Sequence, residues 1–314
     1  MNTLHQYPVC PFCQGSTSPV YQMSEYDVLQ CGGCGTGQVY PMPNDKELLE
    51  FYKGFLFCAD LRNLHCILKT GTELFLGLNL PKTGRLKMLD VGGGGGFYAK
   101  AFEVSGYGMS TYVDLDSEAC SFAKEKVGLK NVLNQDAAML NAGEHKYDFI
   151  MCRHLIEHLV DPAAFILKLT EFLEEGGTLL VICPNGDSLE YFAYPYLNLK
   201  DRVKKISIAS GLSSSRVKLK LLTGKMLHGL DPPRHLWAIS RKGMRMFLEE
   251  NHIHSEIAIF PLTDSVYSPY FSTKTLAQKI WSFFGDMVTA KIAGGTHLSV
   301  VIRKSVRPGI EHAV

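Results

Sequence analysis

The chain has 314 residues, of which 46% are hydrophobic and 20% charged, the composition of a folded protein long enough to bury a sizeable core. Its 32 Lys and Arg residues against 31 Asp and Glu give a formal charge of +1, which argues against a surface built throughout for nucleic acid. The sequence contains no run of about 18 apolar residues and no secretory leader pattern, so we expect a cytoplasmic protein.

Two CxxC pairs stand near the N-terminus, Cys10 with Cys13 and Cys31 with Cys34, and 17 residues separate the pairs. This spacing is typical of a four-thiolate zinc site, in which each tight turn directs two sulfurs at one ion. The alternatives are two disulfides, which a reducing cytoplasm disfavours, and a redox CxxC, which normally comes singly. Because four thiolates leave no open coordination position, we predict a structural zinc in a ribbon over residues 1–43.

A glycine-rich turn follows further along the chain. The predicted strand Leu86–Val91 runs into five glycines, Gly92 to Gly96, and then into a helical stretch that begins at Phe97. Strand, turn and helix together form a site where backbone N–H groups approach a nucleotide-like ligand. The same glycines satisfy the loose dinucleotide pattern, and Asp114 lies twenty residues after Gly94, so NAD stays an alternative cofactor.

Strands and helices then alternate along the chain. This alternation predicts an α/β fold, with a doubly wound parallel sheet and a ligand at the carboxyl ends of its strands. The predicted strands are 108–113, 132–135, 147–152 and 178–183, and the predicted helices are 118–127 and 162–173.

Five segments between Leu86 and Cys183 occur in a characteristic order: LDVGGGGG at 89–96, YVDLD at 112–116, QDA at 135–137, YDFIMCRHLIEHLVDP at 147–162 and EGGTLL at 175–180. Together they resemble the motifs of the class I S-adenosylmethionine (SAM)-dependent methyltransferases. Gly93 and Gly95 depart from the family, which often has Cys or Ala at the first position and Thr or Ser at the second.

The resemblance implies a Rossmann-like, mostly parallel seven-stranded sheet that ends in an antiparallel strand, which 297–303 would form beside 257–260. Asp90 and Asp136 are expected to contact SAM. The alternative for Asp90 is a carboxylate at a strand end with its hydrogen bonds satisfied by the protein, and the alternative for Asp136 is a helix cap. The SAM contacts that the resemblance implies are Asp90, Gly92, Gly94, Gly96, Asp114, Leu115, Asp136, Ala137 and Cys152.

The segment His154-Leu155-Ile156-Glu157-His158 directly follows a predicted strand. Its H-x-x-E-H pattern matches the inverzincin proteases, but those carry it within a long helix, so a protease is disfavoured. Three interpretations stay open: a fourth-motif loop without metal, a substrate contact or general base at His154, and a divalent metal site. The metal site is suggested because the segment resembles E-x-x-E-H of ubiquinone-pathway O-methyltransferases and small-RNA 2′-O-methyltransferases, with His154 replacing the first Glu.

A second histidine, His235, stands in the segment DPPRHLW. Relatives commonly carry a similar His-Leu at the rim of the substrate pocket, so His235 is a candidate base or a metal partner of His158. The alternative is a hydrogen-bonded structural histidine. The predicted catalytic residues are therefore His154, His158 and His235.

A connection over 185–230 is longer than usual and predicts a lid or a substrate-recognition element. It begins with aromatic residues (Tyr191, Phe192, Tyr194 and Tyr196) and carries a net charge of +7 between Asn198 and Lys225. Such a segment suits an anionic substrate, peripheral contact of 191–225 with a membrane, or RNA phosphates. The alternative is a solvated helical hairpin with inward Val203, Ile206, Val217, Leu219 and Leu221.

We therefore expect a SAM-dependent methyltransferase that O-methylates a small-molecule or carrier-linked hydroxyl, on a sugar, glycan or natural product. O-methylation is favoured because the sugar C-methyltransferases that share the cysteine module have a further C-terminal domain. The alternatives are an RNA methyltransferase, which the overall charge disfavours, an NAD-dependent oxidoreductase, and a non-catalytic core. The expected domains are a zinc ribbon over 1–43, a helical connector over 44–84 with a helix over 45–69, and a methyltransferase domain over 85–314 with its insertion over 185–230.

Overall fold

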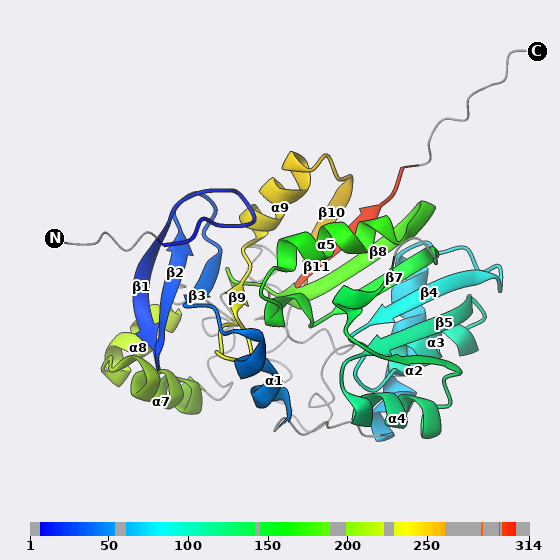
Figure 1. Cartoon of the computed structure of the whole chain (residues 1–314), viewed down its shortest axis with the longest axis horizontal. Helices are drawn as coiled ribbons and strands as arrows, with labels where there is room; N and C mark the ends of the chain where they lie inside the picture. Colours follow the sequence, from blue (N-terminus) through cyan, green and yellow to red (C-terminus); the bar gives the residue numbers. More distant parts are fainter. Residues whose placement is uncertain are drawn as a thin grey trace, which may run out of the picture.

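The computed structural model describes residues 7–53, 61–141, 145–188, 199–222, 229–260 and 297–305, together with the single positions 284 and 295. The chain forms a seven-stranded and a four-stranded sheet (Figure 1). Among the described residues no helix is long and apolar enough to cross a membrane.

The larger sheet has the strand order β10-β11-β8-β7-β4-β5-β6. Strands β4 to β8 pair in parallel, and β11 lies antiparallel between β8 and β10. The predicted fold class is therefore confirmed, including the antiparallel strand near the C-terminus. The strands are β4 (Leu86–Val91), β5 (Gly108–Asp114), β6 (Asn131–Asn134), β7 (Tyr147–Arg153), β8 (Leu173–Pro184), β10 (Ser255–Phe260) and β11 (His297–Arg303).

Helices cover both faces of this sheet because alternate residues of its inner strands are apolar on each side. In β7, Phe149 packs with α2 and α3, whereas Ile150 packs with α5 and α9 on the opposite face. The helices are α2 (Arg62–Gly77), α3 (Phe97–Val104), α4 (Ser117–Glu125), α5 (Pro162–Glu171) and α9 (Arg241–Glu250), with 3-10 turns η1 (Ala137–Met139) and η2 (Ile156–His158).

Two predicted boundaries need correction. The predicted helix 45–69 is represented by α1 (Asp45–Lys53) and by the start of α2 at Arg62, with 54–60 outside the described residues. Strand β8 begins at Leu173, earlier than the predicted 178, because α5 ends at Glu171 and Leu173 pairs with Tyr147 across a local irregularity in register.

The smaller sheet is antiparallel and has the order β1-β2-β3-β9. Its first three strands, β1 (Thr17–Met23), β2 (Tyr26–Cys31) and β3 (Gly37–Tyr40), come from the N-terminal module. Its fourth, β9 (Trp237–Ala238), comes from the segment that precedes α9 and pairs with β3. The proposed boundary after residue 43 therefore separates strands that share one sheet.

The described part of the insertion contains two helices, α7 (Leu199–Ser210), which packs on strand β1, and α8 (Ser214–Leu222), which packs on α7. Val203, Ile206 and Val217 are buried together beside Tyr21, as expected for a helical hairpin. The expectation for Leu219 is wrong, since 63% of it is exposed. Figure 1 shows both helices below β1, at the opposite end of the molecule from α4. The predicted aromatic start of the insertion and the side chain of Leu221 lie outside the described residues.

Candidate functional site

The glycine turn after β4 adopts backbone angles that favour glycine. Gly92, Gly94 and Gly96 all have positive φ, at 63°, 55° and 70°. At Gly93 the requirement is space, because an added Cβ would lie 2.6 Å from Asp90 Oδ2. The departure from the family at this position therefore has a local cause: the buried Asp90 side chain leaves room for glycine alone.

Asp114, at the end of β5, ties the turn to the neighbouring strand. Its carboxylate accepts hydrogen bonds from the Gly94 N–H at 3.2 Å and the Asp116 N–H at 3.0 Å. The Tyr112 hydroxyl lies 3.2 Å from the same carboxylate and 2.7 Å from Gly94 O. Burial raises the pKa of Asp114, and these N–H donors oppose the shift. The predicted ribose acid thus lies directly beside the glycine turn.

The other predicted cofactor residues lie in different surroundings. Asp90 is 3% exposed and accepts from the Ala99 N–H at 3.3 Å, beneath the turn, and burial raises its pKa to about 7. Asp136 is exposed and caps η1 through a 2.8 Å bond from the Ala138 N–H. Both show the contacts of the alternatives, a satisfied carboxylate and a cap, and their contact with SAM stays a prediction.

Three further predicted cofactor positions differ in exposure. Leu115 is 58% exposed beside Asp114, and Ala137 is half-buried in η1. The Cys152 side chain is 1% exposed and belongs to the apolar core, so a ligand could meet only its main chain.

The turn η2 and the segment before β9 bring three potential metal ligands together. Glu157, His158 and His235 each offer an atom within 4.8 Å of the others, a set that we call the acceptor cluster. The two imidazole rings lie edge to face with their centroids 4.7 Å apart. His154 lies outside this set but contacts it, with Nδ1 3.1 Å from Glu157 Oε1.

Main-chain carbonyls fix the orientation of both rings in the acceptor cluster. His158 Nδ1 lies 2.9 Å from Arg234 O, and His235 Nδ1 lies 2.7 Å from Gly229 O. A carbonyl oxygen only accepts, so each Nδ1 carries the proton and each Nε2 keeps a lone pair. Glu157 adds a buried carboxylate whose Oε2 has no hydrogen-bond partner among the described residues. The cluster therefore consists of acceptors without a donor between them.

Burial controls the protonation of these groups. It lowers the pKa of His154 to about 3 and that of His158 to about 4, and it lowers the pKa of His235 as well. Burial raises the pKa of Glu157, which is 1% exposed, and the nearby histidines oppose that shift. Neutral imidazoles, the form that accepts a proton or binds a metal, are thereby favoured.

Two residues near the predicted site were missed by sequence analysis. Tyr52 of α1 places its hydroxyl 2.7 Å from His158 Nδ1 and 3.4 Å from Arg234 O, and burial raises its pKa to about 12. Arg153, at the end of β7, holds its guanidinium 5.5 Å from the Tyr98 ring and lowers the pKa of the neighbouring Asp90. Tyr52 was counted among the apolar residues of a connector helix, but Arg153 could have been noticed as a cation at a strand end.

The four cysteines of the two CxxC pairs also meet as predicted, with their sulfurs within 4.8 Å of one another. Cys10 Sγ and Cys34 Sγ are 3.7 Å apart, and Cys13 Sγ and Cys31 Sγ are 3.4 Å apart. These distances far exceed a disulfide bond of about 2.05 Å and are close to the ~3.8 Å between thiolates that share a tetrahedral zinc. The cysteines thus fit a closed four-thiolate site, which we call the cysteine cluster.

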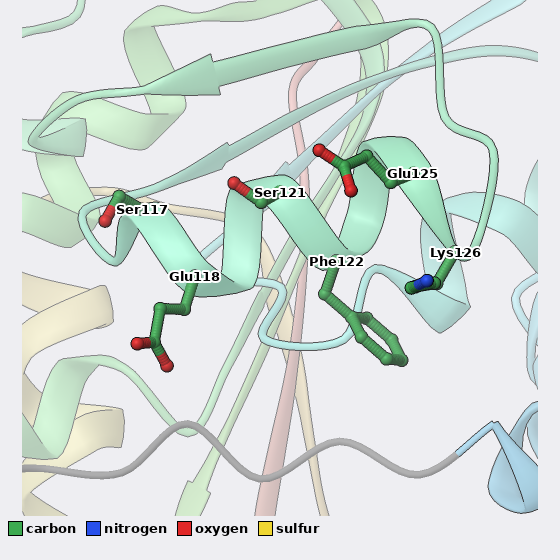
Figure 2. A pocket seen from close by; sticks show the side chains of 6 residues that line it. All are labelled: Ser117, Glu118, Ser121, Phe122, Glu125 and Lys126. Atoms are coloured by element: carbon green, nitrogen blue, oxygen red, sulfur yellow. The ribbon is translucent and has the colours of Figure 1, made fainter.

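A cavity of about 310 Å³ lies elsewhere, along the outer side of α4. Figure 2 shows its lining side chains, which come from this helix and the residue after it. None of the predicted site residues lines it. The lining residues are Ser117, Glu118, Ser121, Phe122, Glu125 and Lys126.

Comparison with known proteins identifies a matching family and related methyltransferases. Residues 60–251 match the profile of a family described as a methyltransferase domain. The chain is 28% identical over 217 residues to a ubiquinone biosynthesis O-methyltransferase of Rickettsia canadensis, with 63% of this chain and 88% of that protein aligned. It is 26% identical over 172 residues to the protein of the same name from Rickettsia conorii, and this alignment covers 50% of the chain and little more than half, 58%, of that relative. A SAM dependent methyltransferase structure from Archaeoglobus fulgidus aligns with a TM-score of 0.46 and 17% identity, covering 76% of this chain and 94% of that one.

Proposed function

The chain belongs to the methyltransferase domain family, as a class I enzyme that uses SAM, and from this premise we propose that it methylates a hydroxyl oxygen of a small-molecule or carrier-linked acceptor. The relatives' name, ubiquinone biosynthesis O-methyltransferase, supports oxygen as the methylated atom. Sugars, glycans and natural products remain the acceptor classes that we propose. The family assignment removes hydride transfer with NAD from consideration.

SAM would lie along the carboxyl ends of the strands, with its adenosine toward β6 and β5 and its methionine toward β4 and β7. Asp136 follows β6, Asp114 ends β5 and the glycine turn follows β4, so these residues would receive the adenine, the ribose and the methionine in that order. Arg153, at the end of β7, would then attract the methionine carboxylate. The same direction along the sheet leads the sulfonium methyl toward His154 and the acceptor cluster.

The observation that carries the assignment of oxygen is the convergence of lone pairs in the acceptor cluster. An acceptor hydroxyl that enters it meets His158 Nε2, His235 Nε2 and a Glu157 carboxylate oxygen, and any of them can take its proton. The hydroxyl oxygen then attacks the SAM methyl group, a C–O bond forms, and the C–S bond breaks to leave S-adenosylhomocysteine. The proton released from the hydroxyl stays on the cluster until solvent removes it.

The same cluster fits a divalent cation, because Glu157 Oε2 has no hydrogen-bond partner among the described residues and two imidazoles lie within 4.8 Å of that carboxylate. When bound, such an ion would lower the pKa of the acceptor hydroxyl. Two nitrogens and one oxygen suit zinc or a similar transition metal better than magnesium. Tyr52 and the Arg234 carbonyl would hold His158 in the orientation that this role needs.

We also propose zinc in the cysteine cluster, on the ligand distances given above. A cytoplasmic location, peripheral membrane contact through 191–225 and RNA as an alternative acceptor stay predictions.

The function can be tested with tritiated-methyl SAM and two probe acceptors, the catechol 3,4-dihydroxybenzoate and a nucleotide sugar. We expect a methyl ether and one S-adenosylhomocysteine per turnover with at least one of these acceptor classes. Glu157→Gln should reduce transfer about 10²-fold or more, while the affinity for S-adenosylhomocysteine is retained. A product methylated on carbon or nitrogen, or full activity in Glu157→Gln, would contradict the proposal.

A further inference from the structure

Leu236 joins the ribbon to the acceptor cluster through its main chain. Its N–H donates to Glu157 O at 2.8 Å, and its carbonyl accepts from the Val39 N–H at 3.1 Å. Val39 belongs to β3 of the ribbon sheet, and the Leu236 side chain is fully buried. A single residue, adjacent to His235, is therefore hydrogen-bonded to the ribbon on one side and to Glu157 on the other.

Trp237 makes a second connection between the same two regions. Its indole N–H donates to Leu159 O at 2.7 Å, one residue after His158. Its ring packs edge to face on Phe12, with centroids 6.1 Å apart, and Phe12 lies between the first two cysteines. The tryptophan is 3% exposed, so neither contact competes with solvent.

Ser240 connects the second CxxC pair to the segment 235–240. The Ser240 hydroxyl donates to Cys34 O at 2.7 Å, and the Ser240 N–H donates to Thr36 Oγ1 at 3.2 Å. The segment 235–240 thus runs along the ribbon from the acceptor cluster to the cysteine cluster. Its position depends on ribbon atoms at Val39, Phe12 and Cys34.

We propose that the cysteine ribbon positions the acceptor cluster, with Leu236 and Trp237 as the positioning residues. Main-chain hydrogen bonds to Asp231 hold His235 within its own turn, and the ribbon contacts of Leu236 and Trp237 fix that turn against η2. The four cysteines would hold a metal ion that stabilises the ribbon, and loss of that ion would release the segment 235–240 and the turn η2 together. The cofactor edge, which lies on β4 and β5, has separate hydrogen bonds and would be retained. The role of the acceptor cluster in methyl transfer rests on the proposed function, whereas its structural coupling to the ribbon does not.

Hydrogen exchange on the full-length protein tests the coupling without any substrate. Cys13→Ser removes a ligand from the cysteine cluster, and Lys242→Ala is the matched control, because it removes a ribbon contact, to Gly33 O, that does not involve Leu236. We expect the Leu236 amide to exchange about tenfold faster or more in Cys13→Ser, while the Gly92 amide, bonded to Val113 O, changes less than about twofold. The control should match the wild type at both amides. Unchanged protection of Leu236 in a zinc-free Cys13→Ser protein would overturn the proposal.

A second variant covers the case in which Cys13→Ser does not fold. Trp237→Phe removes the indole N–H bond to Leu159 O and retains an aromatic ring against Phe12, with the cysteines intact. We expect a rise of about fivefold or more in KM for the acceptor, with zinc content and S-adenosylhomocysteine affinity unchanged within about twofold. An unchanged acceptor KM would overturn the positioning role of Trp237. The exchange experiment needs no acceptor. If no hydroxyl acceptor is found, faster exchange of the Leu236 amide in Cys13→Ser would still support the coupling between the ribbon and the acceptor cluster, although the proposed function would have failed.

Discussion

The two clusters of potential metal ligands among the described residues are built in opposite ways. The cysteine cluster draws four identical ligands from two tight turns within 25 residues of sequence, and it surrounds its centre completely. The acceptor cluster draws one carboxylate and two imidazoles from two segments, with His158 and His235 77 residues apart, and a set of three ligands would leave a coordination position open. The local cluster can form with its own turns, whereas the distant one depends on packing that brings η2 beside the segment before β9. The comparison contrasts a site that we propose stabilises the structure with one that we propose takes part in the chemistry.

The largest expected effect is on stability, and it comes from the cysteine cluster. Cys34→Ser removes a ligand from a closed site and should reduce the zinc content from one ion to none, with a loss of about 4 kcal/mol or more in unfolding free energy. Native mass spectrometry and denaturant unfolding would measure both quantities. If the variant kept its stability, the cluster would not be the structural element that the comparison assumes.

The acceptor cluster should show the reverse pattern, with loss of activity and little loss of stability. Glu157→Gln keeps the size of the side chain but removes the charge and the proton-accepting carboxylate. We expect methyl transfer to fall about 10²-fold or more, with the melting temperature and S-adenosylhomocysteine affinity close to those of the wild type. A similar loss of zinc in this variant would show that the two clusters are not functionally distinct.

Asp114→Ala tests the proposed cofactor site at the ends of β4 and β5, which belongs to neither cluster. The carboxylate accepts from Gly94 and Asp116, and we propose that it also receives the ribose hydroxyls. Calorimetric titration with SAM should show binding weakened about tenfold to a hundredfold, while the fold is retained. Unchanged SAM affinity would remove Asp114 from the proposed cofactor site.

The smallest expected effect is a pH dependence caused by Asp90. Burial raises its folded-state pKa to about 7 from an ordinary value near 3.8, so the folded protein keeps a proton that the unfolded chain releases. The stabilisation is therefore complete below about pH 4 and is lost as pH rises toward 7. The unfolding free energies of the wild type and of Asp90→Asn would be measured across this range. The wild type should lose stability relative to Asp90→Asn as pH rises, and this loss should be absent if the pKa of Asp90 is near its ordinary value.

The sequence predicted those parts of the molecule whose ligands or turns are close together in the chain. The CxxC spacing predicted the meeting of the cysteines, and the glycine run predicted the turn after β4. The contact between Glu157 and His158 also follows from neighbouring positions, and the pairing of His158 with His235 was expected from a resemblance. These features require little knowledge of tertiary packing.

Most of the missed features depend on contacts between distant segments. Strand β9 has only two residues, too few for a detectable period, and its pairing with β3 is decided by packing. Tyr52 reads as one apolar position of a helix, and only the fold places its hydroxyl on His158. The expected burial of Leu219 was wrong for a local reason: residues two apart lie on opposite sides of a helix, and Val217 is the one buried.

The pairing of β9 with β3 also has a consequence for the order of folding. Thr36 and Ser240, which hydrogen-bond beside these strands, are 204 residues apart. A chain emerging from the ribosome therefore exposes both CxxC pairs, the proposed zinc ligands, long before the last strand of the ribbon sheet is synthesised. The unpaired edge of β3 must wait for almost the whole parallel sheet to be made. During synthesis this edge is an open template for other strands, so the late arrival of Trp237 and Ala238 closes a site of misassembly as well as completing the sheet.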